Sequence, residues 1–108
     1  MILDYTINEV WNLLENIEEN QIKETRHFIY SNIKRNYDIG LIYDLILNYM
    51  PVQIGKTSLG TYKIVYEHPL QKSKDIYLII MILNSKEIHL KTIYKANKTR
   101  RIREYEPK

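Results

Sequence analysis

The sequence predicts an α+β fold in which N-terminal helices pack on one face of a three- to four-stranded antiparallel sheet. Two observations lead to this class. Before Pro51, apolar residues recur at the spacing of helical turns, whereas after Pro51 they alternate with polar residues as in half-buried strands. A chain of 108 residues is typical of one domain, so we expect residues 1–108 to form a single unit.

Two of the three predicted helices carry a clear start signal, and one of these also has a clear stop signal. The segment TINEVWNLLENIEEN (6–20) opens with Thr6, and Glu9 stands three residues later, in the capping-box position. The segment IGLIYDLILNY (39–49) follows Asp38, a favourable N-cap residue, and ends just before Pro51. We therefore expect an acidic surface helix within residues 1–20 and a more apolar helix over 39–49.

The remaining helix is predicted through IKETRHFIYSNIKR (22–35). Either Asn20 or Thr25 can supply its N-cap. Ile22, Ile29 and Ile33 mark one side of this segment, and we expect that side to face the core.

Strands are expected over the second half of the chain. A short Gly-bounded segment (52–60) precedes the alternating segment TYKIVYEH (61–68), and the unbroken apolar run IYLIIMIL (76–83) is typical of a central strand. The last strand, EIHLKTIY (87–94), alternates again. A strict period of two places Ile88, Leu90, Thr92 and Tyr94 on one side and Glu87, His89, Lys91 and Ile93 on the other.

Composition narrows the class of protein. The chain has no Cys, which excludes disulfides and thiolate sites, and its longest apolar run is too short to cross a bilayer as a helix. The acidic N-terminus lacks the pattern of a signal peptide, so we expect a cytoplasmic protein without membrane contact. Residues 1–20 hold five acids and no Lys or Arg, whereas residues 91–108 hold seven basic groups, which favours an anionic partner at the C-terminal end. Alternatively, the two ends neutralise each other.

The outer side of the predicted sheet combines the residue types that RNA cleavage needs. If Ile88 and Leu90 face the helices, then Glu87, His89 and Lys91 face away, with Lys63 on a similar side. Attack by the RNA 2′-hydroxyl requires a base, an acid and cations around phosphorus, and histidine suits both proton-transfer roles. The alternative interpretation is a solvated outer face without chemistry. No pair of histidines has metal-ligand spacing, so we expect neither a metal nor another cofactor.

Two other features bear on function. His27 lies in the basic segment TRHFIYSNIKR, where a half-buried helical residue is the structural alternative to a catalytic one, and His68 beside Pro69 is expected to be exposed. The tail KANKTRRIREYEPK interleaves cations with tyrosines, a composition that suits binding of unpaired RNA bases and phosphates. The same cations could instead bind an acidic inhibitor protein. The expected RNA-binding residues are Lys63, Lys98, Arg100, Arg101 and Arg103.

The order of these motifs resembles the RelE/ParE-like toxin superfamily, nearest to its BrnT-type ribonucleases and to related domains with a His followed eight residues later by Arg. The resemblance covers residues 25–106 and rests on RHFIYSNIKR, the helix up to Pro51, the alternating strands and EIHLKTIYKANKTRRIREYE. It implies a metal-independent ribonuclease with a cognate antitoxin. The acidic helix of residues 1–20 is not part of the family pattern.

By position, the resemblance assigns roles to His27 and Arg35 on the shared helix, to Tyr94 in TIY, and to the arginines beyond it. His89 and Lys91 come from the alternation instead. The expected catalytic set is His27, Arg35, His89, Lys91 and Tyr94. Two alternatives stay open: a non-catalytic nucleic-acid-binding protein that uses the same basic face, and a regulatory or immunity-type protein whose acidic helix contacts a basic partner.

Overall fold

A computed structural model describes residues 4–83 and 86–100. The elements are α1 (Ile7–Glu15), η1 (Glu19–Gln21), β1 (Ile22–Glu24), α2 (Arg26–Arg35), α3 (Ile39–Asn48), β2 (Gln53–Ser58), β3 (Thr61–Glu67), β4 (Lys74–Leu83) and β5 (Glu87–Asn97). The α+β class is confirmed. The sheet differs from the prediction, because it has five strands in the order β1-β5-β4-β3-β2 and β1 pairs with β5 in parallel.

The first helix begins as the capping box predicts. Thr6 accepts a hydrogen bond from the Glu9 backbone N–H at 3.2 Å, and Glu9 Oε1 accepts one from the Thr6 backbone N–H at 3.0 Å. The pKa of Glu9 is lowered by the same Thr6 backbone and side-chain groups, so the cap stays charged. The helix ends at Glu15 rather than near Asn20, and it buries Val10, Leu13 and Leu14.

The second helix begins at Arg26 and not at Ile22, the first residue of the predicted segment, because residues 22–24 form a strand. Ile22 to Glu24 pair with Ile88 to Leu90, and Thr25 then caps α2 by accepting from the Phe28 N–H at 3.1 Å. Asn36 ends the helix in the left-handed conformation, with φ of 55°. The predicted inner side was wrong for Ile29 and Ile33, which are both exposed, whereas Phe28 is fully buried.

The third helix matches its signals closely. Asp38 accepts from the N–H groups of Gly40 and Leu41 at 2.9 and 3.3 Å, and the helix ends at Asn48, before Pro51. Its buried residues, Ile42, Leu45 and Ile46, pack against the sheet as part of the core.

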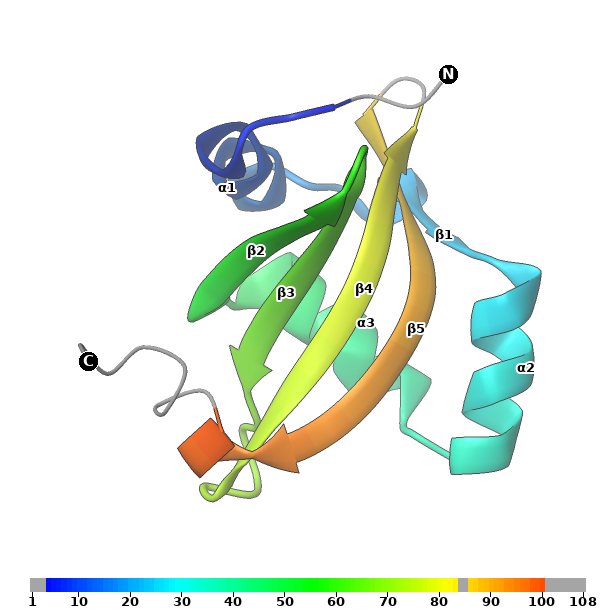
Figure 1. Ribbon diagram of the computed structural model, residues 1–108. Coiled ribbons are helices and arrows are strands. Elements are labelled where there is room, and N and C mark those ends of the chain that lie inside the picture. Colours follow the sequence, from blue (N-terminus) through cyan, green and yellow to red (C-terminus); the bar gives the residue numbers. More distant parts are fainter. Residues whose placement is uncertain (1–3, 84–85, 101–108) are drawn as a thin grey trace.

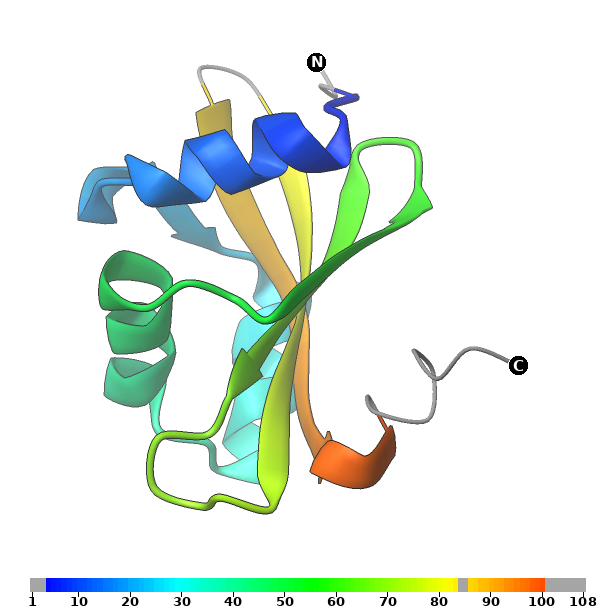
Figure 2. The same ribbon diagram turned by 90° about the vertical axis from the view of Figure 1, so that its left-hand side faces the viewer.

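The sheet has one helical face and one face that we call the outer face. The core on the helical side includes Ile64 of β3, Leu78 of β4, and Ile88 and Leu90 of β5. Figure 1 shows α3 behind the sheet and α2 beside β5, while Figure 2 shows α3 on one side and the helical turn at residues 98–100 on the other. The outer face is therefore opposite the layer that contains α3.

Strand β1 pairs with only the first part of β5, and beyond it residues 25–37 make hydrogen bonds to the same edge of β5. The Leu90 carbonyl accepts from the Thr25 N–H at 3.3 Å and from Thr25 Oγ1 at 2.7 Å. Arg35 Nη1 donates to the Ile93 carbonyl, and the Lys95 N–H donates to Tyr37 Oη at 3.3 Å. These bonds satisfy backbone groups that an open strand edge would leave available for pairing with another chain.

Candidate functional site

The outer face is organised in rows of paired residues that run across the strands. One row joins Gln53, Val65, Tyr77 and Tyr94, and the next joins Gly55, Lys63, Ile79 and Thr92. A third row joins Thr61, Met81, His89 and Lys23. Successive rows are two residues apart along β3 and β4, which corresponds to about 6.6 Å.

A β-bulge at Lys91 changes which residues of β5 share a face. Ile80 pairs with Leu90, but the adjacent Ile79 pairs with Thr92, so Lys91 is an inserted residue without an opposite partner. The expected strict alternation was therefore wrong beyond Leu90. Ile93 is buried in the core instead of lying with His89, and Tyr94 lies on the outer face instead of with Leu90. The insertion thus places Tyr94 and His89 on the same side of the sheet.

His89 lies beside a carboxylate on this face. Its Nε2 is 3.5 Å from Glu87 Oε1, and Glu87 Oε2 is 3.8 Å from Lys23 Nζ. Nε2 is shielded from solvent, although 24% of the His89 side chain is exposed. Nε2 makes no hydrogen bond with any residue that the structure describes. A partly exposed histidine beside a carboxylate is an arrangement that proton transfer can use.

Two tyrosines form a second feature of the outer face. The rings of Tyr77 and Tyr94 stack with centroids 4.9 Å apart and an interplanar angle of 15°. The Arg100 guanidinium carbon lies 5.6 Å from the Tyr77 centroid and 5.9 Å from that of Tyr94. Lys63 Nζ lies 5.6 Å from the Tyr77 ring. Cations over aromatic rings provide the two contact types that single-stranded nucleic acid uses, phosphate pairing and stacking.

The His89–Glu87 pair and the Tyr77–Tyr94 pair lie a short distance apart on the outer face. His89 and Tyr94 are two rows apart, or about 13 Å by the spacing of their partners along β4. Ile79 and Thr92 occupy the row between them. A bound strand following β5 could therefore contact both features at once.

Other predicted site residues lie elsewhere. His27 is exposed in the first turn of α2, not half-buried, and its side chain makes no hydrogen bond or ion pair with any residue that the structure describes. Arg35 is held at the β5 edge by the Ile93 carbonyl. Lys98 Nζ lies 2.9 Å from Glu67 Oε2. Arg101 and Arg103 fall outside the described residues.

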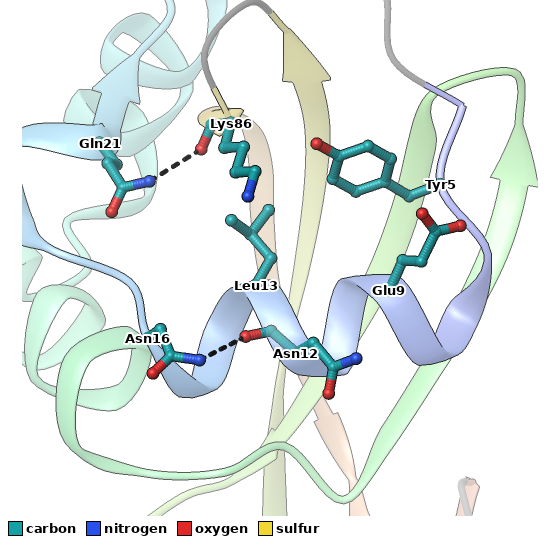
Figure 3. Close-up of a pocket in the computed structure, with 7 residues that line it drawn as sticks. All are labelled: Tyr5, Glu9, Asn12, Leu13, Asn16, Gln21 and Lys86. Carbon is teal, nitrogen blue, oxygen red and sulfur yellow. Dashed lines mark hydrogen bonds between the residues drawn. The ribbon is translucent and has the colours of Figure 1, made fainter.

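One cavity lies away from the outer-face site. It has a volume of about 470 Å³ and lies between α1 and Lys86, the residue just before β5. Figure 3 shows Tyr5 and Glu9 on one side of it, Leu13 at its floor, and Lys86 opposite, where the Lys86 carbonyl accepts from Gln21 Nε2 at 3.3 Å. None of the residues that we predicted to be catalytic lines this cavity.

A second cavity, of about 240 Å³, lies where α3 begins, and His68 and Lys95 contribute to its wall. His68 is buried, so the expectation that it is exposed was wrong. Its Nδ1 accepts from the N–H groups of Leu70 and Gln71, both at 3.1 Å, which places the ring proton on Nε2. Burial, and then the positive charge of Lys95, lower the pKa of His68.

Lys23 and Tyr77 are outer-face residues that our sequence analysis did not identify. Lys23 was included in a predicted helix, and only its pairing with His89 across β1 and β5 brings it to the site. Tyr77 was within an apolar run interpreted as a buried strand, and it is indeed fully buried. The ten tyrosines of the chain were the only sequence feature that pointed to such a cluster.

Neither a metal-binding cluster, a membrane-spanning helix nor a known relative gives a further indication of function. Among the described residues, no three His, Asp or Glu side chains gather closely enough to bind a metal ion. No helix in the described part of the chain is long and apolar enough to span a membrane. No protein-family model matches the sequence, and neither a curated protein nor a solved structure gives a significant match.

Proposed function

We propose that this chain is a metal-independent endoribonuclease of the toxin–antitoxin type, which cleaves RNA by attack of a 2′-hydroxyl. The observation that carries the proposal is the position of His89, which lies beside Glu87 and is partly exposed on the sheet face that also bears Tyr94. The resemblance to the RelE/ParE-like superfamily supports the same function.

In the proposed reaction, His89 Nδ1 accepts the proton of the 2′-hydroxyl as its oxygen bonds to phosphorus. The bond between phosphorus and the 5′-oxygen breaks, and that oxygen takes a proton from a lysine, for which the candidates are Lys23, which pairs with His89, and Lys91, the inserted residue of β5. The products are a 2′,3′-cyclic phosphate and a 5′-hydroxyl. Glu87 orients the imidazole and stabilises the imidazolium that forms.

Binding of the RNA is assigned to the other end of the face. Tyr94 offers a ring for stacking, and Arg100 and Lys63 lie over the tyrosine pair where a phosphate would pass. Lys98, Arg101 and Arg103 extend this cationic segment in the sequence. A cognate antitoxin that covers the outer face and a cytoplasmic location belong to the same proposal.

The test is an RNA cleavage assay in EDTA, with the product ends identified by mass spectrometry. We expect 2′,3′-cyclic phosphate ends, and a loss of about 100-fold or more in rate for His89→Gln, because proton transfer by a positioned side chain commonly contributes that much. The matched control is His27→Gln, which changes the same residue type on the exposed side of α2 and should cleave at the normal rate.

Each variant must first show an unchanged fold by circular dichroism. Full activity of a His27→Ala, His89→Ala double variant would remove histidine from the mechanism. Cleavage that requires an added divalent metal would contradict the proposal as a whole.

A second candidate function is a non-catalytic RNA-binding protein. It is favoured by the tyrosine pair with Arg100, because stacking and phosphate contacts need no proton transfer. This function predicts binding that weakens steeply with salt while no product forms, since phosphate contacts release counterions. Cleavage in EDTA that is lost in His89→Gln would exclude it.

A further inference from the structure

Helix α2 turns most of its apolar side chains away from the fold. Only Phe28 is buried, whereas Ile29, Tyr30 and Ile33 are 46%, 61% and 74% exposed. A surface helix ordinarily directs its apolar stripe at the core. The three residues have i, i+1 and i+4 spacing, so they form one continuous patch, which we call the α2 face. Contiguous exposed apolar patches of this kind mark interaction sites.

The orientation of α2 is fixed by contacts at both of its ends. At the start, Phe28 enters the core and Thr25 binds the Leu90 carbonyl. At the end, Arg35 donates to the Ile93 carbonyl. The helix therefore cannot roll to bury Ile29 and Ile33 without breaking bonds to the β5 edge. The α2 face is exposed because β5 holds the opposite side of the helix.

The α2 face has cations beside its apolar side chains, and α2 itself contains no Asp or Glu. Arg26 is three residues before Ile29 and Lys34 is four residues after Tyr30, so both adjoin the patch, whereas Arg35 is turned toward β5. Lys34 Nζ lies 4.7 Å from the Tyr30 ring, which places a cation directly on the patch. We propose that the α2 face binds an acidic amphipathic helix of a partner protein, with its apolar stripe on Ile29 and Ile33 and its carboxylates on the surrounding cations.

Other occupants fit this surface less well. Two copies of the chain meeting through α2 would bring like charges together, and a second copy's acidic helix α1 has its apolar residues Val10, Leu13 and Leu14 in its own core. RNA would gain little from two isoleucines at the centre of the patch, because it binds through phosphates and stacked bases. The inference does not depend on the proposed ribonuclease activity, which is assigned to the outer face.

The test uses a designed peptide of about 15 residues, with leucines at i, i+4 and i+7 and glutamates at most other positions. It is titrated into ¹⁵N-labelled protein and followed by NMR. We expect binding tighter than about 100 µM, with shifts concentrated in residues 25–37. Ile33→Asp should weaken it at least about tenfold, because it places a carboxylate at the centre of the patch. The fold should tolerate this change, since Ile33 is highly exposed.

The matched control is Leu59→Asp, because Leu59 is 64% exposed in the β2–β3 turn, across the sheet from α2 (Figure 1). This variant should bind the peptide normally, as should His89→Gln, whatever its effect on RNA. Equal binding by Ile33→Asp and the original chain would overturn the inference. The absence of peptide binding would also overturn it. If the peptide fails to bind, the alternative ligands are vesicles containing an anionic phospholipid and a uridine oligomer. Binding of either one that is lost in Ile33→Asp would assign the α2 face to that ligand instead.

Discussion

Tyr77 and Tyr94 stack on the outer face because an inserted residue, Lys91, shifts the second half of β5 by one position relative to the first. Without the shift, Tyr94 would point into the helical layer, where Ile93 now packs. The same shift leaves Ile88 and Leu90 in the core and His89 on the outer face. Bulges are common beside functional sites because they re-aim side chains in this way.

Deleting Lys91 should therefore be far more damaging than replacing it. A continuous β5 would expose either Ile93 or both Ile88 and Leu90, and removing fully buried aliphatic side chains from a core costs about 2 to 5 kcal/mol. Lys91→Ala keeps the inserted residue, so its free energy of unfolding should change by less than about 0.5 kcal/mol. Urea denaturation measures both. Equal stability of the two variants would show that the bulge does not set the register.

The local structure of this protein was predictable where one segment contains its own signals. Thr6 with Glu9 and Asp38 with its following N–H groups start helices at the expected residues, and β4 is central as its apolar run indicated. Strand β1 was missed because three residues carry no usable period. Its existence depends on pairing with β5, far along the chain, and such pairing leaves no local trace in the sequence.

The candidate site was predictable only in part for the same reason. The alternation around Leu90 correctly placed Glu87 and His89 opposite the core. It failed for Tyr94 because periodicity assumes an unbroken ladder, which the bulge interrupts. It also failed on α2, where Ile29 and Ile33 have the spacing of a buried stripe, but the contacts of Phe28 and Arg35 turn the opposite side inward.

Changing Tyr94 should separate stacking from hydrogen bonding on the outer face. Tyr94→Phe keeps the ring over Tyr77 and should keep the stability of the chain. Tyr94→Ala removes the stack and should lower the free energy of unfolding by about 1 to 2 kcal/mol. The proposed function adds that Tyr94→Ala weakens binding of a uridine oligomer, measured by fluorescence anisotropy, by about 1 to 3 kcal/mol. Unchanged affinity in the alanine variant would mean that RNA does not stack on this ring.

Stability should fall as the solution becomes mildly acidic because of His68. Its folded pKa is lowered by burial and by Lys95, so below the ordinary value of 6.5 the unfolded state binds more protons than the folded state. The stabilising effect of neutral His68 is thus complete above that value and is lost as pH falls toward the folded pKa. Protonating Nδ1 would also break both bonds from the Leu70 and Gln71 N–H groups. Tyr37, Asp38 and Lys95 are the other titratable groups around this cavity.

Thermal unfolding between pH 7.5 and 5 measures this dependence, and His68→Asn is the comparison, because its amide oxygen can accept a hydrogen bond without titrating. We expect the variant to be less stable at neutral pH. Its stability should also depend less on pH below 6.5, where His68 of the original chain becomes protonated. If both chains lose stability in parallel as pH falls, another group dominates the acid response.

Replacing Arg35 tests whether this residue has a structural or a catalytic role. Its guanidinium donates to the Ile93 carbonyl at the exposed edge of β5, so Arg35→Gln should lower the free energy of unfolding by about 1 kcal/mol. Arg26→Gln, in the first turn of the same helix, is the control for charge and helix propensity and should have little effect. Under the proposed function, cleavage of RNA, measured where each variant is fully folded, should be unchanged in Arg35→Gln, because α2 lies beside β5 and does not cover the outer face (Figure 1). A variant with normal stability and no cleavage would assign Arg35 to the reaction, as its position in the toxin-like sequence pattern implies, and would move the active site from the outer face toward the α2 edge.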